Sequence, residues 1–145
     1  METTKDYIIL SQLKSDLENK LNRDNDYDTE VMEVKVGEFL WEDMKLKPAI
    51  AIYTMPGEIE KKEFGNVFIK SIHLVIDMFM DNQPGLGEFE DIYKFKDDVE
   101  SFIFKSSDWT YQSESFYVGP SGVYIGGDHD PVKQATVVFF VRYKD

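Results

Sequence analysis

The chain has 145 residues and a mass of 16.9 kDa, the size of one ordinary domain, so we expect a single domain over residues 1–145. The 42% hydrophobic and 14% aromatic content excludes a disordered or collagen-like chain. The absence of cysteine excludes disulfides, thiolate metal sites and a cysteine nucleophile. A formal net charge of −12 argues against a surface that binds nucleic acid or an anionic membrane, and no apolar run approaches the roughly 20 residues of a membrane span.

The first half of the chain predicts one helix and three strands. Apolar residues three and four positions apart predict a helix over about residues 4–22. Alternating apolar residues predict strands over 31–36, 49–55 and 67–80. The charged stretch 58–63 lies between the last two strands and is expected to be a loop or a flexible hairpin tip.

The second half predicts a helix over about residues 88–104 and strands over 109–118, 123–125 and 133–143. Helices this sparse cannot cover both faces of a parallel sheet. We therefore expect an α+β fold, with a mainly antiparallel sheet and both helices packed on one face. The predicted order of elements is α-β-β-β-α-β-β-β.

The other face of this sheet is expected to keep apolar and aromatic side chains exposed. The candidates are Val75, Phe79, Val138 and Phe140. Exposed patches of this kind usually bind a partner. The alternative is that a loop or hairpin of the same chain covers them.

Two histidines are the first candidates for catalysis or metal binding. His73 lies within a predicted strand, and the carboxylate of Asp77 is about 13 Å away along that strand, too far to orient a general base. His129 lies between Asp128 and Asp130, but consecutive residues of an extended segment point in opposite directions. A solvated turn is therefore favoured over a metal site there.

Two further motifs resemble binding loops and fail at their discriminating positions. The acidic run 24–30 has aspartate at alternate positions, as at the start of a calcium loop, which then requires Gly and Glu where this chain has Thr29 and Lys35. The sequence Gly85-Leu86-Gly87 lacks the third glycine and the βαβ unit of a phosphate-binding loop. We predict no metal, no cofactor and no enzymatic activity.

The arrangement of elements resembles a known family. The sequence Lys47-Pro48-Ala49-Ile50-Ala51-Ile52-Tyr53 opens the second strand with a basic-Pro-Ala-aliphatic pattern, a Trp (Trp109) follows the second helix, and the last strand closes on Arg142-Tyr143. With the amphipathic first helix and the long apolar strand, this layout resembles the tail-terminator (tail-completion) proteins of long-tailed phages.

The resemblance implies a structural virion protein that forms a six-membered ring. The ring would cap the tail tube and provide the surface on which the head docks. The implied partners are further copies of the chain, the tail tube protein and the head–tail connector protein, while DNA passes without specific binding and no membrane is involved. The implied location is the virion tail, assembled in the host cytoplasm.

Two loops are expected to make contacts in such a ring. The loop 58–66 would face the tube or the lumen, through Glu58, Glu60, Lys61, Lys62 and Glu63. The loop 119–130 would face a neighbour or the head side, through Tyr124, Asp128 and His129.

The negative charge of the chain opposes the assembly of such a ring. Six copies at −12 each carry −72 formal charges, so apolar patches and strand-edge pairing must hold them together, and added salt should ease assembly. The alternatives are a head-side connector or adaptor, an acidic protein that mimics nucleic acid, and a small enzyme whose pocket would hold perturbed carboxylates or His73.

Overall fold

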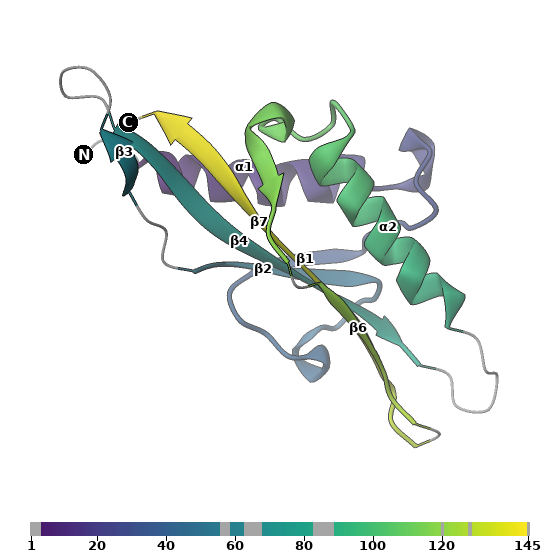
Figure 1. Cartoon of the computed structure of the whole chain (residues 1–145). Helices are drawn as coiled ribbons and strands as arrows, with labels where there is room; N and C mark the ends of the chain where they lie inside the picture. The colour runs from purple at the N-terminus through teal and green to yellow at the C-terminus, as the bar shows by residue number, and fades with distance from the viewer. Residues whose placement is uncertain are drawn as a thin grey trace.

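One β-sheet with two α-helices against it makes up the described part of the chain in the computed structural model (Figure 1). The structure describes residues 4–55, 59–62, 68–82, 89–119, 121–127 and 129–144, with only the backbone at 59–62 and 68. The helices are α1 (Lys5–Lys20) and α2 (Glu90–Phe104), and the short 3₁₀ helices are η1 (Arg23–Asn25), η2 (Trp41–Asp43) and η3 (Gln112–Glu114). The strands are β1 (Glu33–Val36), β2 (Ala49–Met55), β3 (Ile59–Lys62), β4 (Phe68–Asp81), β5 (Ser115–Tyr117), β6 (Gly122–Ile125) and β7 (Val132–Lys144).

The two long strands β4 and β7 form the centre of the sheet. They pair antiparallel from Ile69 opposite Lys144 to Asp81 opposite Val132. β2 lies on the other side of β4, and β1 pairs with β2 at that edge. β5 and β6 pair with successive parts of the free side of β7. Among the described strand pairs only β1–β2 is parallel, which confirms the mainly antiparallel sheet.

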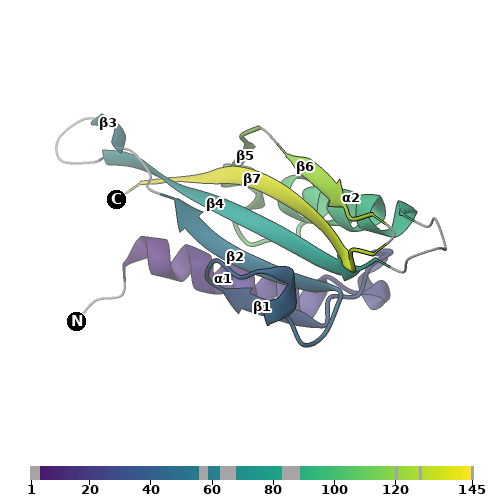
Figure 2. The ribbon, with the colours of Figure 1, turned by 90° about the horizontal axis from the view of Figure 1, so that it is seen from below.

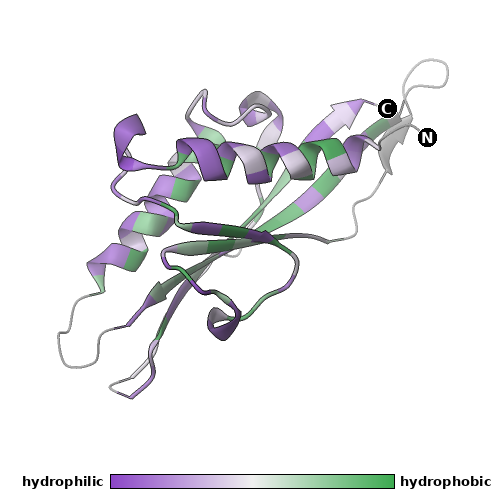
Figure 3. Cartoon of the chain, turned by 180° about the vertical axis from the view of Figure 1, so that it is seen from behind, coloured by the Kyte–Doolittle hydropathy of each residue, from purple (hydrophilic) through white to green (hydrophobic). Residues whose placement is uncertain are grey.

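Both helices lie over the same face of the sheet (Figure 3), which confirms the predicted α+β layer. The apolar stripes of α1 and α2 meet alternate residues of the central strands in one core. Its fully buried members include Ile9, Leu13, Leu17, Ile92, Phe95, Val99, Phe102, Leu74, Ile76, Val137 and Phe139. Burying a side chain of this size stabilises the fold by roughly 2 kcal/mol, so the spacing of apolar residues determines which face each element buries.

An additional strand changes the predicted order of elements. Residues 59–62 form β3, which pairs antiparallel with the start of β4, so the order is α-β-β-β-β-α-β-β-β. The sequence Ile-Glu-Lys-Lys lacks the apolar alternation of a half-buried strand. Its strand conformation is therefore explained by backbone pairing with the long β4 rather than by a hydrophobic pattern in its sequence. The predicted loop at 58–63 is therefore a strand in its described part.

The strand that the sequence predicts over 109–118 is shorter in the structure, where only β5 is extended. The ring of Trp109 is 1% exposed, and its indole N–H donates to the hydroxyl of Ser115 at 2.8 Å. The amide of Gln112 donates to the carbonyl of Trp109, so the chain curls into η3 before β5 begins. Residues 109–114 therefore turn around the buried ring of Trp109, and only Ser115–Tyr117 of the predicted strand are extended.

Candidate interaction surface

A row of rings crosses the face of the sheet that the helices leave uncovered. His73 on β4, Phe140 on β7 and Phe116 on β5 lie directly opposite one another in the strand register. The ring centroids of His73 and Phe140 are 5.7 Å apart, those of Phe140 and Phe116 are 5.2 Å apart, and both pairs are stacked. Met55 on β2 continues the row beyond His73. We call His73, Phe140 and Phe116 the aromatic row.

The aromatic row offers apolar surface to solvent. Phe116 is 41% exposed and Met55 is 40% exposed, while His73 and Phe140 between them are half-buried. The guanidinium carbon of Arg142 lies 5.9 Å from the centroid of the Phe116 ring. Stacked rings contribute about 0.5–1.5 kcal/mol per pair beyond the area that they bury. Together with Met55, the aromatic row spans four neighbouring strands, a width of roughly 14 Å.

Val75 lies next to the aromatic row and is not exposed. It is 3% exposed and stands in register between Tyr53 on β2 and Val138 on β7. The prediction that Val75 is exposed is wrong, because the side chains of Tyr53 and Val138 flank it on the two adjoining strands and leave little room for solvent. Val138 and Phe140, the candidates on β7, are half-buried.

Phe79 is covered by the segment 38–47 of the same chain. It is 1% exposed, so the prediction of an exposed Phe79 is also wrong. Its cluster comprises Met44, Ala49 and Ala51, with Phe39 and Trp41 packed against them. The indole N–H of Trp41 donates to the carbonyl of Met80 at 3.0 Å, and the ammonium of Lys47 lies 4.1 Å from the Trp41 ring centroid. At this end of the sheet a loop closes the face, which was the alternative expectation.

A polar cluster separates the covered end of the face from the aromatic row. The carboxylate of Asp77 accepts hydrogen bonds from the hydroxyl of Thr136, at 2.8 Å, and from the hydroxyl of Tyr53. Burial raises the pKa of Asp77, the charge of Glu38 adds to this, and the two hydroxyl donors act against it. Burial likewise raises the pKa of Tyr53. The cluster joins β2, β4 and β7 through a carboxylate whose partners are both hydroxyl groups.

Two of the predicted contact residues lie on β6 and in the turn that follows it. Tyr124 is exposed, and its hydroxyl donates to the carboxylate of Asp130 at 2.7 Å, a bond that raises the pKa of Tyr124. His129 is exposed in the turn itself. The side-chain amide of Asn82 donates to the carbonyls of Gly126 and Asp130, which ties the turn to the end of β4.

The structure does not bring the two predicted contact loops together. β3 pairs with the start of β4, whereas the β6–β7 turn adjoins its end, so the two lie at opposite ends of the sheet (Figures 1 and 2). For Glu60, Lys61 and Lys62 only the backbone is described, within β3. Glu58, Glu63 and Asp128 lie outside the described residues.

The acidic run 24–30 begins within η1 and continues as a turn after it. Asp26 has a backbone φ of 67°, the left-handed conformation that Asp and Asn tolerate best among residues with a Cβ. The amide of Thr29 donates to the carboxylate of Asp98 at 2.8 Å. Among the described residues no group of three or more histidine or acidic side chains is placed to hold a metal ion.

Neither helix that the structure describes is long and apolar enough to cross a membrane. Comparison of the sequence with models of known protein families and with characterised proteins finds no match.

Proposed function

We propose that the chain is a structural virion protein, a tail terminator whose copies form a six-membered ring that caps the tail tube and presents the head-docking surface. The observation that carries this proposal is the aromatic row, which presents stacked rings on a sheet face that neither helix covers. The α+β layer with both helices on one face agrees with the layout that the family resemblance implies.

The chemistry of this face suits contact between proteins. The cores of protein–protein interfaces are enriched in aromatic residues, methionine and arginine and depleted in acidic residues. Phe116, Phe140, Met55 and Arg142 provide this composition at one end of the face. In a chain with 28 acidic residues, such a surface is where copies can approach with the least electrostatic repulsion.

The adjoining sheet edge extends the proposed contact. β5 and β6 form the outer edge beside β7, and Tyr117 and Tyr124 on them are 51% and 53% exposed. An edge strand offers backbone hydrogen-bonding groups to a second chain. We assign this edge and the aromatic row to contacts between copies. The tail tube protein, the head–tail connector protein and passing DNA enter the proposal through the family resemblance.

The proposal is tested by imaging the protein with the tube protein of the same phage. We expect negative-stain electron microscopy to show tubes that end in a ring. We expect Phe116→Glu to abolish the rings, because the new charge would be desolvated within the contact. The control is Tyr93→Glu, which places the same charge at an exposed ring on α2, away from the sheet face. Wild-type protein that neither joins nor caps tubes overturns the proposal.

A further inference from the structure

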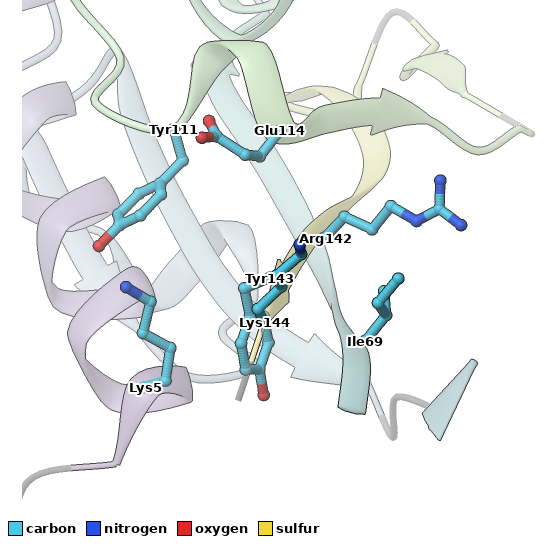
Figure 4. Close-up of a pocket in the computed structure, with 7 residues that line it drawn as sticks. All are labelled: Lys5, Ile69, Tyr111, Glu114, Arg142, Tyr143 and Lys144. Carbon is cyan, nitrogen blue, oxygen red and sulfur yellow. The ribbon is translucent and has the colours of Figure 1, made fainter. Parts of the chain in front are cut away.

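A cavity at one end of the sheet is lined by more basic than acidic residues in an acidic chain. Lys5 and Arg142 come to it from opposite sides, and the side chain of Arg142 points away from Lys5 (Figure 4). The cavity has a volume of about 560 Å³ and is lined by Lys5, Ile69, Tyr111, Glu114, Arg142, Tyr143 and Lys144. Three of these residues are cations and one is an acid, whereas the whole chain has 16 cations and 28 acids. We call this the basic cavity.

The walls of the basic cavity come from distant parts of the sequence. The ammonium of Lys5, at the start of α1, lies 5.3 Å from the centroid of the Tyr111 ring and points toward it (Figure 4). The hydroxyl of Tyr143 on β7 donates to the carboxylate of Asp6, which ties β7 to α1 and places one further acid beside the cavity. Elements on both sides therefore hold the cavity in shape.

The basic cavity lies where β5 stops pairing with β7. The register of these strands ends at Ser115 opposite Val141, and the cavity residues Arg142 and Lys144 follow on β7. Arg142 also stands near the Phe116 ring of the aromatic row. The cavity is thus continuous with the surface that we assign to contacts between copies.

The other end of α1 carries the opposite charge. The run after α1 exposes four acids, which we call the acidic tip: Asp24, Asp26, Asp28 and Glu30. The hydroxyl of Tyr27 donates to the carboxylate of Asp108 at 2.8 Å, and the amide of Thr29 donates to Asp98. These bonds hold the segment against the rest of the fold. Three cations, Arg23, Lys47 and Lys94, lie near its last two acids, with which they line a smaller cavity.

We infer that the basic cavity of one copy binds the acidic tip of the next copy. α1 has 16 residues and separates the two surfaces by about 24 Å, so they cannot meet within one copy. A pair of complementary surfaces at opposite ends of one helix makes a head-to-tail contact, which forms a ring where the rotation from copy to copy closes and a filament where it does not. The inference rests on the proposed ring and adds a charged contact to the apolar one.

Charge reversal tests this contact. One variant is Lys5→Glu, which reverses a charge in the basic cavity, and the other is Asp24→Lys, which reverses one in the acidic tip. Both side chains are exposed, so the substitutions do not change the core. The glutamate of Lys5→Glu lies in the first turn of α1, where an acidic side chain stabilises a helix. We expect each variant alone to need about a tenfold higher concentration for half-assembly, because truncated or reversed charge pairs weaken association strongly. Sedimentation velocity over a concentration series measures this.

A mixture of the two variants provides the decisive result. In an equimolar mixture each reversed cavity can bind a reversed tip, and each native cavity a native tip, so copies alternate around the ring. We expect the mixture, and the double variant Lys5→Glu/Asp24→Lys, to assemble as the wild type does. The controls Lys45→Glu and Asp97→Lys change the net charge by the same amounts at exposed positions elsewhere, and we expect them to leave assembly unchanged.

The outcomes separate this inference from the proposed function. Wild-type rings that neither reversal weakens overturn the inference and leave the tail-terminator proposal standing. Weakening by Lys5→Glu alone would assign another anionic occupant to the cavity and would also overturn it. Weakening by both variants without rescue in the mixture has the same consequence. Wild-type protein that forms no ring, alone or on tubes, overturns both.

Discussion

The carboxylate of Asp16 on α1 accepts two hydrogen bonds from Thr110, one from the amide nitrogen at 3.0 Å and one from the hydroxyl at 2.8 Å. Asp16 is 3% exposed, and it also accepts a bond from the side-chain amide of Gln12 at 2.7 Å. These bonds fasten the segment after α2 to the first helix. They also position Tyr111, the next residue, in the wall of the basic cavity.

Removing the carboxylate of Asp16 should therefore destabilise the protein. Asp16→Ala leaves the amide and hydroxyl of Thr110 without their acceptor, and we expect the free energy of unfolding to fall by about 3 kcal/mol. Urea denaturation measures the change. Asp16→Asn keeps one acceptor oxygen and should cost less. The control is Asp97→Ala, at an exposed position of α2, whose free energy of unfolding should stay within about 0.5 kcal/mol of the wild-type value. A change as small as this in Asp16→Ala would contradict the role that we assign to Asp16.

The phenol of Tyr27 gives the stability a dependence on alkaline pH. Burial, together with Asp108, raises the pKa of Tyr27 from 10.0 to about 12. Because the pKa in the folded protein lies above the value in the unfolded chain, the stabilisation is complete below pH 10 and is lost as the pH rises to about 12. We expect Tyr27→Phe to be about 1 kcal/mol less stable than the wild type at pH 8, with the difference shrinking above pH 10.

Denaturation curves at several alkaline pH values measure this difference. The control is Tyr7→Phe, since Tyr7 is 61% exposed, and its stability should run parallel to the wild type throughout. A constant gap between Tyr27→Phe and the wild type from pH 8 to 12 would show that the Tyr27 phenol does not titrate as expected.

The carboxylate of Asp77 destabilises the folded protein at neutral pH, whereas the phenol of Tyr27 stabilises it. Its pKa in the folded protein is raised, mainly by burial, so the folded state favours the protonated form. Stability from this group is greatest below its ordinary pKa of 3.8 and falls as the pH rises through the raised value. We expect Asp77→Asn, which can still accept from Thr136, to raise the urea midpoint at pH 7. The gain should vanish near pH 3, and a gain of equal size at both pH values would contradict this explanation.

The fold was predictable where one periodic pattern governs a whole element. The alternation of Leu74 and Ile76 on β4 and of Val137 and Phe139 on β7 places both strands against the helices, as the core confirms. β3 was missed because its charged residues carry no such pattern, and its strand conformation comes from pairing with β4.

The candidate surfaces were less predictable because they depend on contacts between distant residues. Alternation places Phe79 on the helix-free face, but it cannot indicate that Trp41 and its neighbours fold over it, since the segment 38–47 has no period. The basic cavity likewise has no local signal. Lys5 and Lys144 are 139 positions apart in the sequence, and only the fold, in which Tyr143 on β7 is hydrogen-bonded to Asp6 on α1, brings them to one cavity.

The proposed ring combines repulsion between copies with two attractive contacts, so its assembly should depend on salt in two stages. Repulsion between copies of charge −12 acts at long range, and it weakens as the Debye length falls from about 30 Å at 0.01 M salt to about 8 Å at 0.15 M. The contact between the acidic tip and the basic cavity acts at short range and loses strength only at higher salt, where the Debye length is about 3 Å at 1 M.

We therefore expect assembly to strengthen from 0.01 to about 0.15 M sodium chloride and to weaken again toward 1 M. Sedimentation velocity at fixed protein concentration gives the assembled fraction at each step. In Lys5→Glu the weakening toward 1 M should disappear, because the attractive charge pair is already lost, whereas the control Lys45→Glu should keep it. If the assembled fraction of the wild type falls steadily from the lowest salt concentration, the proposed repulsion between copies is contradicted. If it rises steadily to 1 M, the charged contact is contradicted, and the apolar contact through the aromatic row is unaffected.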